Sequence, residues 1–185
     1  MKILGISGSL RRDSHNTQLL RAAAQLLSPG SELEVWEGLK AVPPYDGDDD
    51  AGEPRPWVLR SLAHAIDEAD VVLFATPEYN HSIPGQLKNA LDWISRPLKS
   101  SPLKGKPVAV VGASTGLFGA VWAQAELRKV LGAIGARVID RELPVGLASD
   151  AFTEEGRLAD PDLELVLSDL LAELVGEAQP VAAGA

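Results

Sequence analysis

A polar stretch near the start of the chain, GSLRRDSHN at residues 8–16, carries side chains that can hold an anion. It follows a short apolar run and precedes a segment of helical spacing, so it connects a strand to a helix N-terminus. Free backbone N–H groups and the helix dipole favour an anion there. Hydroxyls, amides and one guanidinium can together bond the three oxygens of a terminal phosphate. The candidate donors are Ser9, Arg11 or Arg12, Ser14, Asn16 and Thr17.

The same stretch also fits a polar turn in which Ser14 or Asn16 caps the helix. The loop alone does not separate these two interpretations. It lacks the P-loop pattern and the GxGxxG dinucleotide fingerprint, which excludes both of those phosphate-binding motifs. His15 is expected to face solvent.

Two further polar stretches follow apolar runs of strand-like composition. In PEYNHSIP, residues 77–84, Tyr79 can offer a face or an edge to a planar ligand, and Asn80 adds a side-chain amide. In ASTGLFG, residues 113–119, small residues allow a ligand to approach the backbone closely. The alternative for residues 77–84 is a rigid turn in which Tyr79 only packs. The alternative for residues 113–119 is an ordinary turn between a strand and a helix.

The chain has few groups for catalysis by its own side chains. It contains three histidines and no cysteine, no Ser–His–acid arrangement stands out, and GxSxG is not present. His81 is expected to be a bystander rather than a base, and the run Asp48–Asp50 fits a solvated turn better than a metal site. A site rich in donors but poor in acids and bases indicates a cofactor that performs the chemistry itself.

The elements that must position these stretches alternate in type along the chain. This alternation predicts an α/β fold, a doubly wound parallel sheet with helices on both faces. Such sheets bind ligands outside the carboxyl ends of their strands, where the strand order reverses. The predicted strands are 2–7, 32–36, 70–76, 107–112 and 136–139, and the predicted helices are about 16–27, 57–69, 84–96, 121–131 and 161–175.

Length and composition predict one domain and exclude some partners. The chain has 185 residues, of which 45% are hydrophobic, enough for one core over residues 1–175 with a flexible tail over 176–185. The net charge of −9 argues against nucleic-acid and anionic-membrane partners, since both require a basic face. The first apolar stretch is too short for a signal peptide or a membrane span, so a cytoplasmic protein is expected.

Three blocks of the sequence resemble the NAD(P)H-dependent FMN reductases of the flavodoxin-like superfamily, a group that includes chromate, quinone and azo-dye reductases. The blocks are GSLRRDSHN (8–16), PEYNHSIPGQLKNALDW (77–93) and GASTGLFGA (112–120). The resemblance spans about residues 1–175. It implies a flavodoxin-like three-layer fold with five parallel strands in the order 2-1-3-4-5. It also implies that FMN passes hydride from NAD(P)H to a small-molecule acceptor such as a quinone, an azo compound, a metal oxyanion or free flavin.

The resemblance further implies a role for each matching residue, with the flavin carrying the chemistry and no catalytic side chain. Ser9, Arg11, Ser14, Asn16 and Thr17 would hold the FMN phosphate; Pro77, Glu78, Tyr79 and Asn80 would line the isoalloxazine and ribityl; Ser114, Thr115 and Gly116 would contact the pyrimidine side.

The family also implies a homodimer or homotetramer with the segment around residues 84–96 in the interface. The chain departs from the family pattern at Ala120, where a glycine is common, and near Trp122, where a basic residue is common. A flavodoxin-like electron-transfer module that docks a redox partner protein is the alternative function. The sequence identifies neither the acceptor nor a preference between NADPH and NADH.

Overall fold

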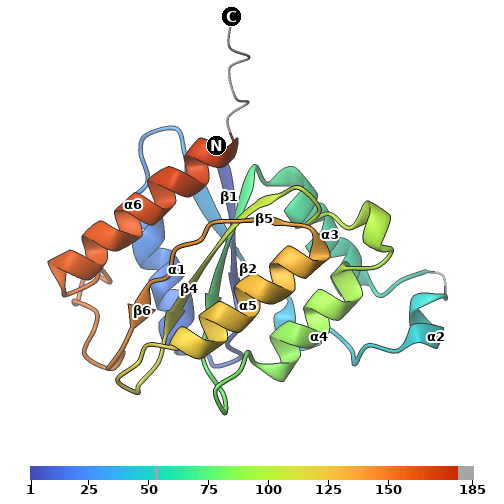
Figure 1. Cartoon of the computed structure of the whole chain (residues 1–185), viewed down its shortest axis with the longest axis horizontal. Helices are drawn as coiled ribbons and strands as arrows, with labels where there is room; N and C mark the ends of the chain where they lie inside the picture. Colours follow the sequence, from blue (N-terminus) through green and yellow to red (C-terminus); the bar gives the residue numbers. More distant parts are fainter. Residues whose placement is uncertain (53, 179–185) are drawn as a thin grey trace, which may run out of the picture.

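A parallel sheet runs through the centre of the computed structural model, which describes residues 1–52 and 54–178. Its order is β2-β1-β3-β4-β5, with β6 also paired to β4, and helices cover both faces (Figure 1). This confirms the predicted α/β doubly wound fold and the strand order 2-1-3-4-5. The strands are β1 (Lys2–Ser7), β2 (Glu32–Trp36), β3 (Val71–Thr76), β4 (Pro107–Ala113), β5 (Arg137–Val138) and β6 (Pro144–Val145).

Two separate hydrophobic cores hold the helices on the sheet. Strand side chains alternate between the faces, so Leu4 and Phe74 face one core while Ile3 and Leu73 face the other. The first core contains the buried side chains of α3 (Trp57–Glu68), α4 (Gly85–Ile94) and α5 (Val121–Ile134). The second contains those of α1 (His15–Gln25) and α6 (Pro161–Ala178). The sheet is therefore buried on both faces, which explains its nearly continuous apolar central strands.

The edge of the sheet beside β4 differs from the single strand predicted at residues 136–139. β5 pairs with the first residues of β4 and β6 pairs with the last two. Between them, the buried side chain of Gln124 bonds the backbone of Leu143, accepting from its N–H at 3.1 Å and donating to its carbonyl at 3.2 Å. A side chain from α5 thus helps to hold the residue before β6, and no local sequence pattern marks that contact.

Residues 37–56, which lie between a predicted strand and a predicted helix, contain two short helical turns, η1 (Leu39–Ala41) and α2 (Gly47–Asp50). The carboxylate of Asp46 accepts from the N–H of Asp48 at 2.7 Å and caps α2, and Asp50 bonds Arg55. Across residues 1–52 and 54–178, no three His, Asp or Glu side chains converge in a group that could hold a metal ion. A third turn, η2 (Leu98–Ser100), follows α4.

The C-terminal helix is longer than predicted. α6 reaches Ala178, so residues 176–178 of the predicted tail are helical, and the rest of that tail, 179–185, lies outside the described residues. None of the described helices is long and apolar enough to cross a membrane.

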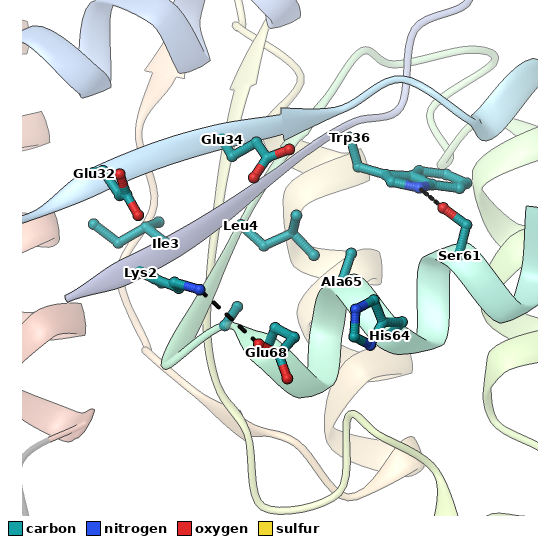
Figure 2. A pocket seen from close by; sticks show the side chains of 11 residues that line it. Lys2, Ile3, Leu4, Glu32, Glu34, Trp36, Ser61, His64, Ala65 and Glu68 are labelled. Atoms are coloured by element: carbon teal, nitrogen blue, oxygen red, sulfur yellow. Dashed lines mark hydrogen bonds and ion pairs between the residues drawn. The ribbon is translucent and has the colours of Figure 1, made fainter.

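The edge strand β2 borders a groove of about 380 Å³ beside α3 (Figure 2). Glu32, Glu34 and Trp36 line it from β2, and the indole N–H of Trp36 donates to Ser61 Oγ at 3.3 Å. Carboxylates on an edge strand discourage pairing with a further strand. None of the residues that line this groove belongs to the three polar loops described next.

Candidate functional site

The three polar loops meet at the carboxyl ends of β1, β3 and β4, around a hollow of about 120 Å³. This is the edge of a doubly wound sheet at which ligands bind. Most of the predicted site residues line the hollow, whereas Thr17, Asn80 and Gly116 do not. The lining residues are Ser9, Arg11, Ser14, His15 and Asn16 from the first loop, Pro77, Glu78 and Tyr79 from the second, and Ala113, Ser114 and Thr115 from the third.

The first loop presents donors at the N-terminus of α1. Ser14 is the N-cap, and its Oγ accepts from the N–H of Thr17 at 3.2 Å. The first amides of a helix have no partner within the helix, so those of His15 and Asn16 stay available for an anion. Arg11 lines this hollow and Arg12 does not. Capping and ligand contact are therefore compatible roles for Ser14.

Asn16 joins the first loop to the end of β4. Its Nδ2 donates to the carbonyl of Ala113 at 2.9 Å, and its Oδ1 accepts from the N–H of Ala113 at 3.0 Å. The side chain is buried and bonds a residue 97 positions away. Asn16 therefore keeps two of the three loops at a set separation, a role that sequence reasoning missed.

His15 is half-buried rather than fully exposed, which differs from the expectation that it faces solvent. Its ring stacks parallel to Phe152, with ring centroids 6.4 Å apart. Its Nδ1 is buried and has no hydrogen-bond partner within the described part of the chain. A buried polar atom without a partner costs free energy, so a ligand atom in the hollow would stabilise this nitrogen. No sequence pattern indicates this contact, because Phe152 lies far from His15 along the chain.

The second loop contains a tight turn formed by residues 79–82. Tyr79 and Ser82 exchange two backbone hydrogen bonds, at 3.0 and 3.1 Å. Asn80 and His81 have φ values of 52° and 60°, as a type I′ turn requires at both central positions. The turn places Asn80 at a tip away from the hollow and leaves Tyr79 half exposed at its rim.

Glu78 holds the second loop to the helix that follows the third loop. Its Oε2 accepts from the N–H groups of Trp122 at 3.0 Å and Ala123 at 3.1 Å, which are orphan amides in the first turn of α5. Its Oε1 lies 3.6 Å from Nδ1 of the exposed His81. The predicted lining residue is therefore also a helix cap, and the three loops are cross-linked by Asn16 and Glu78.

The third loop is held by the segment 144–148, which sequence reasoning did not connect to the site. The N–H of Ser114 donates to Val145 at 3.0 Å, the N–H of Ala148 donates to Ser114 at 3.0 Å, and that of Leu147 donates to Gly116 at 3.0 Å. Ala120 has a φ of 62°, a left-handed conformation that glycine adopts more easily. A glycine at this position would therefore adopt the same backbone conformation with less strain.

An exposed apolar rim flanks the hollow on the side of α5. We call Tyr79, Leu117, Phe118 and Trp122 the apolar rim; each has at least 43% of its surface exposed. The rings of Phe118 and Trp122 meet edge to face, with centroids 5.2 Å apart. The ring of His81 meets that of Trp122 edge to face as well, with centroids 4.8 Å apart. Grouped large apolar side chains on a surface indicate a binding area.

Comparisons with known proteins support one family. A family model described as NADPH-dependent FMN reductase matches residues 1–150. The chain is 42% identical over 174 residues to an NAD(P)H-dependent FMN reductase of Pseudomonas aeruginosa, covering 93% of this chain and 92% of that protein. It is 37% identical over 141 residues to a quinone reductase of Escherichia coli strain K12, covering 76% and 74%. The solved structure of the flavoenzyme FerB, an NAD(P)H:(acceptor) oxidoreductase from Paracoccus denitrificans, matches with a TM-score of 0.82 and 32% identity, covering 96% of both chains.

Proposed function

Because this chain belongs to the NADPH-dependent FMN reductase family, we propose that its three-loop hollow holds FMN and that it reduces quinones with NAD(P)H. The protein is a flavin-dependent oxidoreductase. When bound, FMN supplies the chemistry: it accepts a hydride from NAD(P)H and passes electrons to the acceptor. The chain's own residues then have to hold, orient and shield the reacting groups.

The donor set of the first loop fits the phosphate of FMN. Arg11 supplies a charge, Ser9 and Ser14 supply hydroxyls, and the amides at the start of α1 point their dipole at the same hollow. His15 Nδ1, buried without a partner among the described residues, is a further atom that a phosphate oxygen would satisfy. The Asn16 amide, already bonded to Ala113, would position this loop more than grip the phosphate.

The other two loops fit the ring end of FMN. Tyr79, Ser114 and Thr115 line the same hollow from the second and third loops. Tyr79 would pack on the isoalloxazine, while the small residues would let the backbone approach its pyrimidine edge. Because Glu78 and Asn16 tie the loops together, the ring would be held at a set angle for hydride transfer.

The apolar rim supports a quinone as the acceptor class. Leu117, Phe118 and Trp122 offer aromatic and aliphatic surface next to the hollow, which suits a flat, largely apolar molecule better than a metal oxyanion. The E. coli relative, named as a quinone reductase, adds support from an independent direction. The rim is the observation that carries the choice of acceptor.

Steady-state turnover of the purified protein tests this proposal. We expect oxidation of NADPH or NADH with benzoquinone and no added partner protein, and a raised KM for quinone in a Phe118→Ala/Trp122→Ala variant. Lys129→Ala, an exposed substitution further along α5, is the control and should leave the KM unchanged. Turnover only after a redox protein is added would instead identify the electron-transfer module.

The oligomeric state stays a prediction. A homodimer or homotetramer, as the family resemblance implies, would be seen as two or four times the mass of 19.6 kDa in light scattering. A monomer at micromolar concentration would contradict it.

A further inference from the structure

A second hollow, of about 390 Å³, lies on the other side of the first loop at the carboxyl end of β2. We call it the basic hollow. It shares Ser9 and Arg11 with the three-loop hollow that we propose holds FMN, which we call the flavin hollow, so the two adjoin across residues 9–11. Trp36 and Leu39 contribute apolar surface to it. The basic hollow therefore adjoins the end of the flavin hollow that we propose holds the FMN phosphate.

The basic hollow concentrates positive charge in an acidic protein. Arg11, Arg12, Arg21 and Lys40 line it, with Glu37 as the one carboxylate. The whole chain has a net charge of −9, so this local excess runs against its average. None of the four cations forms an ion pair in the part of the chain that the structure describes, although seven other basic residues do.

Three different elements bring these cations together. Arg21 lies one helical turn beyond Thr17 on α1, on the face that borders the hollow, and Lys40 lies on η1 directly after β2. Like charges that gather without partners repel one another, and an anion between them relieves that repulsion. A phosphate dianion is the ligand whose charge and oxygens match several guanidinium and ammonium donors.

We propose that the basic hollow binds the 2′-phosphate of NADPH, which rests on the proposed oxidoreductase function. NADH lacks this phosphate, so Arg12, Arg21 and Lys40 would make the chain prefer NADPH. Adjacency supports the assignment, because the nicotinamide has to reach the flavin while the other end of the dinucleotide lies elsewhere. Trp36, anchored by its bond to Ser61, adds a flat apolar wall for the adenine end.

The groove beside α3 explains why a phosphate would stay on one side of Trp36. That groove also uses Trp36, but Glu32, Glu34 and Glu68 line it against a single Lys2 (Figure 2). Its carboxylates repel a dianion, whereas the basic hollow attracts one. The two hollows on β2 thus have opposite electrostatic preferences.

Binding of 2′,5′-ADP to the FMN-loaded protein, followed by calorimetry, tests the site without turnover. In Arg21→Ala/Lys40→Ala, neither residue lines the flavin hollow, so FMN content should match that of the unchanged protein. We expect the Kd for 2′,5′-ADP and the KM for NADPH to rise by about tenfold or more, with the KM for NADH within about twofold. Lys129→Ala is the matched control and should change none of these values.

Three outcomes would overturn the assignment. The Kd for 2′,5′-ADP could stay unchanged in the variant. The KM values for NADPH and NADH could rise equally, which would indicate contact with a part common to both. Inorganic phosphate or 5′-AMP could bind as tightly as 2′,5′-ADP, which would indicate a site for free phosphate groups.

A second variant and a separate outcome make the result of this test unambiguous. If the alanine variant does not fold, Arg21→Gln/Lys40→Gln removes the same charges with longer side chains. Failure of the protein to bind FMN or to oxidise either dinucleotide would instead contradict the proposed function, so the two failures are distinguishable.

Discussion

The first and second loops of the site are similarly rich in polar residues, but they use them differently. In residues 8–17, Arg11 and two serines face the flavin hollow, and Asn16 alone is bonded to another loop. In residues 77–84, Glu78 bonds the amides of α5 and the tight turn holds itself by backbone bonds. One loop mainly offers groups to a ligand, and the other mainly holds a surface in place. A motif residue can do either, and only its partners show which.

Arg11→Ala should give the largest effect and defines the binding side of this contrast. Loss of a charge-assisted bond of about 1.5–3 kcal/mol should raise the Kd for FMN roughly 10- to 100-fold. The free energy of unfolding of the FMN-free protein should stay within about 0.5 kcal/mol, since Arg11 is exposed. Flavin fluorescence titration and urea unfolding measure the two. An unchanged FMN affinity would remove Arg11 from the phosphate site.

Asn16→Ala should show the opposite pattern within the same loop. It leaves the buried N–H and carbonyl of Ala113 without their partner, so the free energy of unfolding should fall by about 2 kcal/mol. Urea unfolding of the FMN-free protein measures this. If stability is kept and only FMN affinity falls, Asn16 is a ligand-binding residue like Arg11.

Glu78→Gln tests whether the second loop mainly stabilises the structure, and its expected effect is smaller than that of Asn16→Ala. Glutamine keeps one acceptor oxygen for the amides of Trp122 and Ala123 but removes the charge that favours a helix N-terminus. The free energy of unfolding should fall by about 0.5–1 kcal/mol, with FMN affinity changed by less than about threefold. If the variant kept its full stability but no longer bound FMN, the second loop would be a ligand-binding loop like the first.

His81→Ala should have the smallest effect. The imidazole is exposed and lies 3.6 Å from a carboxylate that α5 already occupies, so its removal should cost less than about 0.5 kcal/mol. The kcat and its pH profile should be unchanged, because no side chain has to act as the acid or base. A pH profile flattened by the substitution would give His81 a catalytic role after all.

The fold was largely predictable because its signals are local. Apolar runs such as residues 71–76, and the spacing of Leu87, Ala90, Leu91 and Ile94, report burial on a strand or on one helix face. β6 and the turns in residues 37–56 were missed for the converse reason. Each is at most a few residues long and shows no periodic pattern. The residue before β6 is held by a distant group, Gln124 at Leu143, and η1 by Gln86 at the carbonyl of Leu39.

The candidate site was predictable in its place but not in its internal roles. The three loops were placed at one edge of the sheet because parallel strands end together, and the structure brings them around one hollow. His15 was predicted to be exposed and instead stacks on Phe152. Thr17, predicted to hold the flavin phosphate, lines the basic hollow and not the flavin hollow.

The sequence by itself determined the alternation of strands and helices, which loops carry the polar side chains, and the edge of the sheet at which those loops gather. Those properties follow from backbone preferences and burial, which neighbouring residues encode. Tertiary structure alone decided that Asn16 bonds a residue 97 positions away, that Glu78 caps α5, and that Arg12, Arg21 and Lys40 surround one hollow. Those roles depend on distances between segments, which exist only once the sheet has brought its loops together.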